Sequence, residues 1–175
     1  PRVDASRIAV MGFSRGGQTA LYSSLQRFQS QWNRSGVLPA AFIPLYPTCT
    51  TQYLRETEIG GGPIRIFHGT ADNYVRIGPC KAYVARLQAA GVDVTLTEMA
   101  GAHHAYDYPL FPIEPVVVKG AQTTQCALKE QATGSVINID TGKPLATTDT
   151  CRGLDPQVAY APEATRRTEA AVREF

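Results

Sequence analysis

The sequence predicts an α/β fold with a mostly parallel sheet, and three observations lead to this prediction. Over about the first 100 residues, segments with the pattern of strands alternate with segments of helical period. The strand segments are short and continuously apolar, which is typical of strands that helices cover on both faces. Gly and Pro residues separate the segments. Because crossovers between such strands are right-handed, we expect the strands to run parallel.

Four segments are the strand candidates, at residues 7–13 ("RIAVMGF"), 40–46 ("AAFIPLY"), 63–69 ("PIRIFHG") and 92–99 ("VDVTLTEM"). The last of them alternates apolar and polar residues, and the first is almost purely apolar. Pro44 interrupts the second candidate. Since proline cannot donate to a β-ladder, the second strand is predicted to be bent or short.

The helix candidates show apolar residues at steps of three and four. One stripe consists of Leu21, Leu25, Phe28 and Trp32. It predicts a continuous helix over residues 17–32. A second helix is expected to begin at Pro79 and end at Gly91, and a third to begin at Pro162, because proline favours the first helical turn and glycine the end.

Composition limits the class of protein. The chain has 175 residues, of which 43% are apolar, and its net charge of +2 is dispersed without a run of like charges. One globular unit that binds no nucleic acid is therefore expected. No apolar run approaches the roughly 20 residues that cross a bilayer, so no membrane span is expected. The sequence begins with Pro1 and shows no signal-peptide pattern, so we expect a segment to precede it.

Four cysteines are widely spaced, at Cys49, Cys80, Cys126 and Cys151. Without a Cys-x-x-Cys pair, a zinc or thioredoxin-type site has little support, and the even number favours disulfides over buried thiols. Three pairings are possible. Pairing Cys126 with Cys151 would staple a predicted hairpin within residues 124–145 and would leave Cys49 for Cys80. Disulfides would indicate a periplasmic or secreted protein.

The stretch Gly12-Phe13-Ser14-Arg15-Gly16 has the pattern of a nucleophile elbow. Such a turn between a strand and a helix forces the serine into strained backbone angles and needs small residues two before and two after it. A strand candidate ends at Phe13 and a helix candidate follows, as this turn requires. Ser14 is therefore the candidate nucleophile; the alternative is a turn serine in an inert junction.

A serine hydroxyl needs a base, and the chain has three histidines. His68 lies at the end of a strand candidate, where a polar residue in a loop is the simpler interpretation. His103 and His104 follow the last strand candidate, at the edge where the elbow emerges. The residues alone do not choose between these neighbours, whose side chains are expected to point apart.

Asp72 is the candidate acid that orients the base, because it follows the third strand candidate at the same edge of the sheet. Asp93 lies at the opposite end of a strand, and Asp107 is only three residues from His104, so both are expected to make surface or capping contacts. The order Ser, Asp, His is the order found in α/β-hydrolases.

Three stretches, "GFSRGG", "FHGTADNYV" and "GAHHAYD", resemble the carboxyl-terminal half of the dienelactone hydrolase family of α/β-hydrolases, over residues 3–108. The resemblance implies that His104 is the base, since it matches the histidine of the family's Gly-Ala-x-His-x-Phe/Tyr stretch. Founding members of the family carry cysteine at the elbow. Ser14 in its place favours ordinary ester chemistry over a dienelactone substrate.

The resemblance also implies that residues 1–175 form part of an α/β-hydrolase domain, with strands five to eight in residues 1–108 and a hairpin and helix extension in residues 109–175. The first of these strands would then present an open apolar edge. We expect the missing amino-terminal half to come from the same gene product or another chain. The backbone N–H of Arg15 would supply one oxyanion donor and the missing half the second.

The function expected from these residues is hydrolysis of a carboxylic ester or lactone through an acyl-enzyme, on a small-molecule substrate and without cofactor or metal. Two alternatives stay open: a prolyl-oligopeptidase-like peptidase, and a non-catalytic binding module or inactive fragment.

Further side chains have two interpretations each. Arg15 and Arg76 either attract a substrate carboxylate or are merely solvated. Three tyrosines either line the acyl pocket or pack in the core: Tyr46, Tyr74 and Tyr106.

Overall fold

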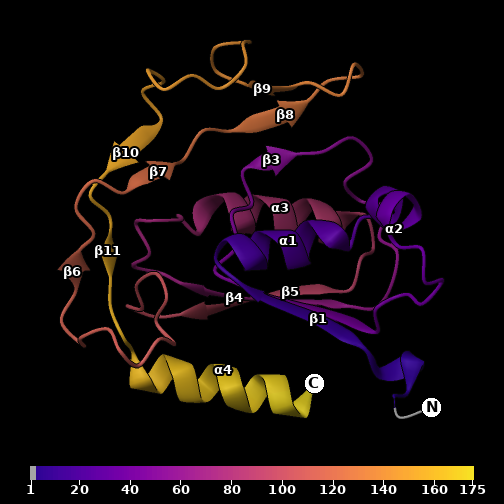
Figure 1. Cartoon of the computed structure of the whole chain (residues 1–175), viewed down its shortest axis with the longest axis horizontal. Coiled ribbons are helices and arrows are strands. Elements are labelled where there is room, and N and C mark those ends of the chain that lie inside the picture. The colour runs from indigo at the N-terminus through magenta and orange to yellow at the C-terminus, as the bar shows by residue number, and fades with distance from the viewer. Residues whose placement is uncertain (1–2) are drawn as a thin grey trace.

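The computed structural model describes residues 3–175, apart from the side chain of Thr124, and contains a four-stranded sheet with helices on both faces (Figure 1). Its strands are β1 (Ala9–Phe13), β2 (Ala41–Leu45), β4 (Ile64–Gly69) and β5 (Val94–Met99). They lie in the order β1-β2-β4-β5, and every neighbouring pair is parallel. The predicted parallel sheet is therefore confirmed. A short 3₁₀-helix, Ala5–Arg7, precedes β1.

The core forms two layers, one on each face of the sheet, and helices cover both. α1 (Arg15–Ser23) and α3 (Gly78–Ala89) cover one face of the sheet, and α4 (Pro162–Glu174) covers the other (Figure 1). Buried side chains on the α1 and α3 side include Leu21, Phe42 and Leu87. Those on the α4 side include Phe67 and Ala164. Burial on both faces explains the apolar character of β2 and β4.

The continuous helix predicted over residues 17–32 is wrong. The structure has two helices here, α1 and α2 (Gln26–Trp32), separated at Leu25. Leu25 is extended, with φ −65° and ψ 127°, and its backbone forms a bridge with Ile59. The N–H of Gln26 donates to the carbonyl oxygen of Glu58 at 2.8 Å. Apolar spacing does not reveal this break, because it arises from pairing with a distant segment.

The strand around Pro44 is also more regular than predicted. β2 is a central strand of five residues, and Pro44 pairs in register with Gly12 of β1. Phe42 and Tyr46, on either side of Pro44, donate their N–H groups to Pro63 and Phe67 on the β4 side. In a parallel strand alternate residues donate to the same neighbour, so only the single donor of Pro44 is lost there.

The C-terminal segment forms an arch of short strands that runs past the carboxyl end of the sheet and over the side that α1 and α3 cover (Figure 1). These strands are β6 (Val116–Val117), β7 (Gln122–Thr124), β8 (Leu128–Glu130), β9 (Val136–Asn138), β10 (Arg152–Leu154) and β11 (Gln157–Val158). β8 and β9 form the predicted hairpin, and β8 also pairs with β3 (Thr51–Gln52). Disulfides join Cys126 to Cys151 and Cys49 to Cys80, which is the pairing that stapling the hairpin favoured.

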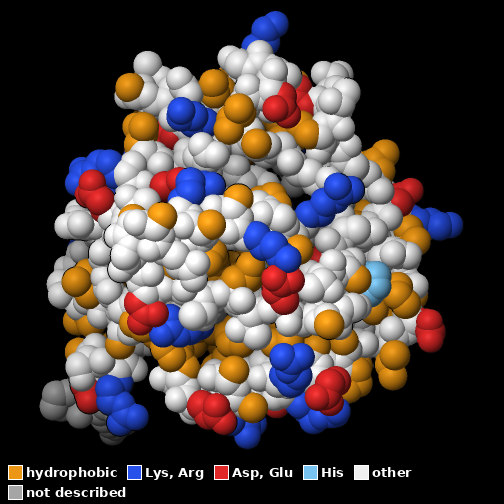
Figure 2. Space-filling model, turned by 180° about the vertical axis from the view of Figure 1, so that it is seen from behind, with side chains coloured by type: hydrophobic (Ala, Val, Ile, Leu, Met, Phe, Trp, Pro, Cys, Tyr) orange, Lys and Arg blue, Asp and Glu red, His pale blue; other side chains and the backbone are white. Residues whose placement is uncertain are grey.

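β1 is an edge strand of the sheet. Met11 and Phe13 on it are 43% and 46% exposed, so the strand presents the apolar edge expected from the resemblance. On the face of the molecule that is turned away in Figure 1, basic and acidic side chains are interspersed (Figure 2). Among the described residues, no helix is both long and apolar enough to cross a membrane.

Candidate active site

Ser14 occupies the tight turn between β1 and α1, with φ 52° and ψ −114°. A positive φ is strained for a residue with a side chain, and the surroundings hold it in place. The N–H of Ser14 donates to the carbonyl oxygen of Leu45 at 3.0 Å. A Cβ atom on Gly12 would lie 2.1 Å from the carbonyl oxygen of Gly16, so the turn requires glycine two residues before the serine.

The glycine requirement after the serine differs from the prediction. A Cβ atom on Gly16 would meet nothing within 4 Å, whereas one on Gly17 would lie 2.4 Å from the carbonyl oxygen of Leu45. The close approach of α1 to β2 therefore falls on Gly17, three residues after Ser14. Gly16 contributes through its backbone, which passes against Gly12.

A row of hydrogen bonds links Ser14, His104 and Asp72. Ser14 Oγ lies 2.8 Å from His104 Nε2, and His104 Nδ1 lies 2.8 Å from Asp72 Oδ2. The three residues follow β1, β5 and β4, whose carboxyl ends meet at one edge of the sheet. His104 and Asp72 are each only 5% exposed. Removal from water strengthens the electrostatic attraction between such groups.

Asp72 is oriented by its own loop. Its Oδ1 accepts hydrogen bonds from the backbone N–H groups of Tyr74 at 2.9 Å and Val75 at 2.7 Å. The other oxygen, Oδ2, is left to His104. An ionised carboxylate can only accept, so the proton of a neutral His104 lies on Nδ1, and the lone pair of Nε2 faces Ser14.

Two tyrosine rings enclose the imidazole of His104. Tyr74 stacks on it with ring centroids 4.7 Å apart, and Tyr46 meets it edge-on at 4.9 Å. The hydroxyl of Tyr46 donates to Asp107 Oδ1 at 2.6 Å, and burial together with this carboxylate raises the pKa of Tyr46. Tyr106 is buried and its hydroxyl bonds with that of Thr168. Tyr46 and Tyr106 thus pack in the core.

The other candidate residues lie away from the Ser14 hydroxyl. His68 is buried, with Nδ1 3.1 Å from the carbonyl oxygen of Gly69, and burial lowers its pKa. His103 also has a buried Nδ1, which has no hydrogen-bond partner among residues 3–175. Asp93 forms a surface ion pair with Arg65. The structure therefore brings His104 and Asp72 to the serine.

A cavity of about 250 Å³ adjoins Ser14. It is lined by Ser14, Arg15, Gln18, Thr48, Thr50, Thr51, Tyr74, Val75, Gln122, Thr123 and Leu128. Arg15 thus borders the cavity, whereas Arg76 does not. The contribution of Gln122, Thr123 and Leu128 could not be predicted, because only the tertiary arrangement places the C-terminal arch above the elbow.

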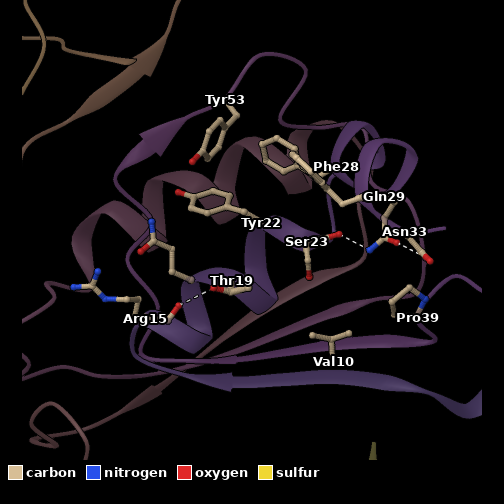
Figure 3. Close-up of a pocket in the computed structure, with 12 residues that line it drawn as sticks. Val10, Arg15, Thr19, Tyr22, Ser23, Phe28, Gln29, Asn33, Pro39 and Tyr53 are labelled. Atoms are coloured by element: carbon tan, nitrogen blue, oxygen red, sulfur yellow. Dashed lines mark hydrogen bonds between the residues drawn. The ribbon is translucent and has the colours of Figure 1, made fainter. Parts of the chain in front are cut away.

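A larger cavity of about 770 Å³ lies beside the edge strand (Figure 3), and Arg15 and Gln18 of α1 line both cavities. Val10 of β1 borders it below, and the rings of Tyr22, Tyr53 and Phe28 gather at its upper side. Tyr22 and Tyr53 meet edge-on, with ring centroids 4.7 Å apart. Ser14 does not line this cavity, so it is separate from the hydrogen-bonded row.

Comparison with known proteins gives consistent matches. A family model described as "Phospholipase/Carboxylesterase" matches residues 1–111. The solved structure of a dienelactone hydrolase-like promiscuous phosphotriesterase, P91 from metagenomic libraries, is 18% identical with a TM-score of 0.61. A structure named m3DLH is 23% identical with a TM-score of 0.60. No curated protein matches the sequence.

Both structural matches cover 99% of this chain but only 53% and 52% of the matching chains. The chain thus spans about half the length of these solved structures. At these identities the likeness shows a common fold and nothing finer.

Proposed function

The chain belongs to the phospholipase/carboxylesterase family and has the α/β-hydrolase fold, and we propose that it carries the catalytic residues of a serine hydrolase of carboxylic esters or lactones. The hydrogen-bonded row from Ser14 through His104 to Asp72 is the observation that supports this proposal. It supplies a nucleophile, a base and a group that orients the base.

In the proposed acylation step, Ser14 Oγ attacks the carbonyl carbon of the ester while its proton passes to His104 Nε2. Asp72 accepts a hydrogen bond from the Nδ1–H group of His104 and stabilises the imidazolium. When the tetrahedral intermediate collapses, the bond to the alcohol oxygen breaks and His104 returns the proton to that oxygen. A water then attacks the acyl-enzyme, with His104 again as base, and releases the acid and Ser14.

The negative charge that develops on the carbonyl oxygen in the tetrahedral intermediate needs hydrogen-bond donors to stabilise it. Arg15 is the first residue of α1, so its backbone N–H has no acceptor within the helix and lies at the positive end of the helix dipole. We assign it as one oxyanion donor. The second is proposed to come from the part of the fold that this chain does not cover, since the chain spans about half of P91. Loss of one such donor costs about 10²–10³ in rate.

The open edge of the sheet also supports the proposal that further strands complete the fold. β1 carries the exposed Met11 and Phe13, and the cavity of Figure 3 lies beside it. We propose that strands of the same gene product or of another chain pair with β1. Two disulfides accord with folding in an oxidising compartment, so a periplasmic or secreted location is proposed.

A fluorophosphonate probe tests the proposal on the protein as its gene encodes it. We expect one covalent adduct, located on Ser14 by peptide mass spectrometry, and hydrolysis of p-nitrophenyl butyrate. Ser14→Ala should abolish both. Ser30→Ala is the matched control, because its hydroxyl bonds only to the carbonyl oxygen of Gln26 in an exposed helix.

The outcomes separate the candidate functions. Absence of an adduct, with the protein folded by circular dichroism, would reject the serine hydrolase and favour a binding module. An adduct on Ser14 with cleavage of peptide anilides but not of esters would favour a peptidase.

A further inference from the structure

We propose that the cavity beside Ser14 selects small esters that carry a hydroxyl group, and that the C-terminal arch provides part of this selectivity. The inference rests on the proposed ester hydrolysis and adds a substrate class to it. The residues concerned are those of the 250 Å³ cavity, here called the roofed cavity.

The roofed cavity is polar on most of its walls. Four threonines and two glutamines line it, namely Thr48, Thr50, Thr51, Thr123, Gln18 and Gln122. Aliphatic side chains come only from Val75 and Leu128. Polar groups in a cavity of this size bind water when no ligand is present. An apolar group that displaced this water would leave the polar groups unpaired, whereas a hydroxyl could replace the lost hydrogen bonds.

Thr123 gives this cavity a specific hydrogen-bonding group. The residue is 3% exposed, and its hydroxyl has no hydrogen-bond partner among residues 3–175, the side chain of Thr124 left aside. It pairs with Gly153 of β10, where a Cβ atom would lie 2.7 Å from Thr123 Oγ1, so glycine leaves room for the hydroxyl. Rotation about χ1 moves the hydroxyl of a threonine from one staggered position to another. A turn of the Thr123 hydroxyl toward a ligand would break no hydrogen bond with the described residues.

The walls of the roofed cavity are held in place before any ligand binds. The N–H of Leu128 donates to the carbonyl oxygen of Thr50 at 2.9 Å, which joins the arch to the loop after β2. Cys49 lies in that loop, and Cys126 lies between Thr123 and Leu128, and both cysteines are in disulfides. Rigid walls cannot close around an apolar group, so the polar groups keep their selectivity.

The volume of the roofed cavity that this chain encloses favours a small ligand. At about 250 Å³ it is smaller than the roughly 300–1,000 Å³ of pockets for drug-sized molecules. A short hydroxyacyl group or a short polyol therefore fits. Both present hydroxyls, and the experiment below distinguishes them.

Two pairs of esters test the inference on the protein as its gene encodes it. In the acyl pair, p-nitrophenyl 3-hydroxybutyrate is compared with p-nitrophenyl isovalerate, in which a methyl replaces the hydroxyl. In the alcohol pair, 2,3-dihydroxypropyl butyrate is compared with 2-methylbutyl butyrate. Each kcat/KM is divided by the rate of hydrolysis in hydroxide, which removes intrinsic reactivity. We expect at least a tenfold preference for the hydroxylated member of one pair, because about one hydrogen bond to the hydroxyl can produce a difference of this size.

The variants Thr123→Val and Thr50→Val remove one hydroxyl each at nearly constant volume. Each should reduce the preference about fivefold or more. Thr147→Val is the control, since Thr147 is an exposed residue between Cys126 and Cys151 and does not line the cavity. No preference in either pair, or a preference that neither variant reduces, would overturn the inference.

A binding measurement distinguishes failure of the inference from failure of the proposed function. If neither member of a pair is hydrolysed, ester hydrolysis itself fails. Saturation-transfer NMR on Ser14→Ala then compares methyl 3-hydroxybutyrate and glycerol with methyl isovalerate. Stronger transfer to a hydroxylated probe, lost in the doubly substituted Ser14→Ala, Thr123→Val protein, supports the polar cavity, and equal transfer to all probes rejects it.

Discussion

At the scale of single residues, Asp72 uses its two carboxylate oxygens for different contacts. Oδ1 accepts two backbone N–H groups of its own loop, and Oδ2 accepts from His104. The first contacts fix the carboxylate, and the second fixes which nitrogen of His104 carries the proton. A substitution that keeps the shape of the Asp72 side chain but changes the acceptor that faces His104 therefore separates the two contributions.

Asp72→Asn should reduce kcat for p-nitrophenyl butyrate by about 10⁴, because an amide can present an N–H to His104 and so favour the wrong tautomer. The midpoint of urea unfolding should change little, since the amide oxygen still accepts from the loop. Asp93→Asn is the control, because Asp93 pairs with Arg65 at the surface. A tenfold loss or less would show that Asp72 does not act through His104.

His68 provides a prediction on pH. Burial lowers its pKa below the ordinary value of 6.5, against the opposing charge of Asp72, so the folded protein keeps it neutral. In the unfolded chain His68 takes up a proton as the pH falls through about 6.5. The unfolded state then binds more protons, and the free energy of unfolding falls as the pH drops from 7 toward 5.

We expect His68→Gln to flatten this dependence. Urea titrations at pH 5, 6 and 7 on both proteins would measure it, and the difference between the slopes isolates His68 from the other histidines. Equal slopes would contradict the prediction.

At the scale of elements, the turn into α1 depends on two of its three glycines for space. Gly12 and Gly17 each face a carbonyl oxygen that a Cβ atom would overlap, whereas Gly16 faces open space. The elbow holds Ser14 in place because α1 crosses β2 at this short distance. Substitutions at the two neighbouring helical glycines should thus differ sharply.

Gly17→Ala should lower the free energy of unfolding by about 2–3 kcal/mol, because its Cβ would overlap backbone atoms that cannot easily move. Gly16→Ala should be neutral or stabilising by up to about 1 kcal/mol, because alanine favours helix. Urea unfolding of both variants measures the contrast. Similar losses in both would mean that the strain resides in the backbone of the turn and not in the contact with Leu45.

The C-terminal arch is the second element with a measurable contribution. The Cys126–Cys151 disulfide closes a loop with a sequence separation of 25 residues around the β8–β9 hairpin. Such a bond stabilises mainly by restricting the unfolded chain, by roughly 3 kcal/mol for a loop of this length. Replacing both cysteines by alanine should lower the free energy of unfolding by about that amount. A loss below 1 kcal/mol would show that strand pairing alone holds the arch.

At the scale of the whole molecule, the open edge of the sheet is the dominant feature. β1 has a neighbour on one side only, and Met11 and Phe13 are exposed on its α4 side, where they line a cavity of about 270 Å³. An exposed apolar edge strand offers unpaired backbone groups to other chains. Residues 1–175 produced as such should therefore self-associate as the concentration rises.

Met11→Lys should weaken this association at least tenfold, since a charge on an edge strand opposes strand pairing. Leu110→Lys is the control, because Leu110 is exposed but lies outside the strands. Sedimentation velocity between about 5 and 100 µM would measure both. A monomeric wild-type chain across this range would show that the edge is protected by means other than pairing.

Much of this molecule could be predicted locally. The order of strands and helices, the elbow at Ser14 and the candidate Asp72 depend on hydrophobic period and turn residues, which act over neighbouring positions. Contacts between distant segments account for the errors. The break at Leu25 results from a bridge to Ile59. Pro44 fits in a central strand because Phe42 and Tyr46, two residues before and after it, donate their N–H groups to the adjacent segment.

The α/β class, the parallel strands and the residue types at the candidate site follow from the amino-acid sequence, because periodicity and chain order encode them. The geometric distinction between the adjacent histidines comes from the fold, since the direction of a side chain depends on the residues packed around it. The fold also sets which walls surround Ser14. Gln122, Thr123 and Leu128 reach the cavity from more than 100 positions along the chain, through an arch that strand pairing and a disulfide hold in place.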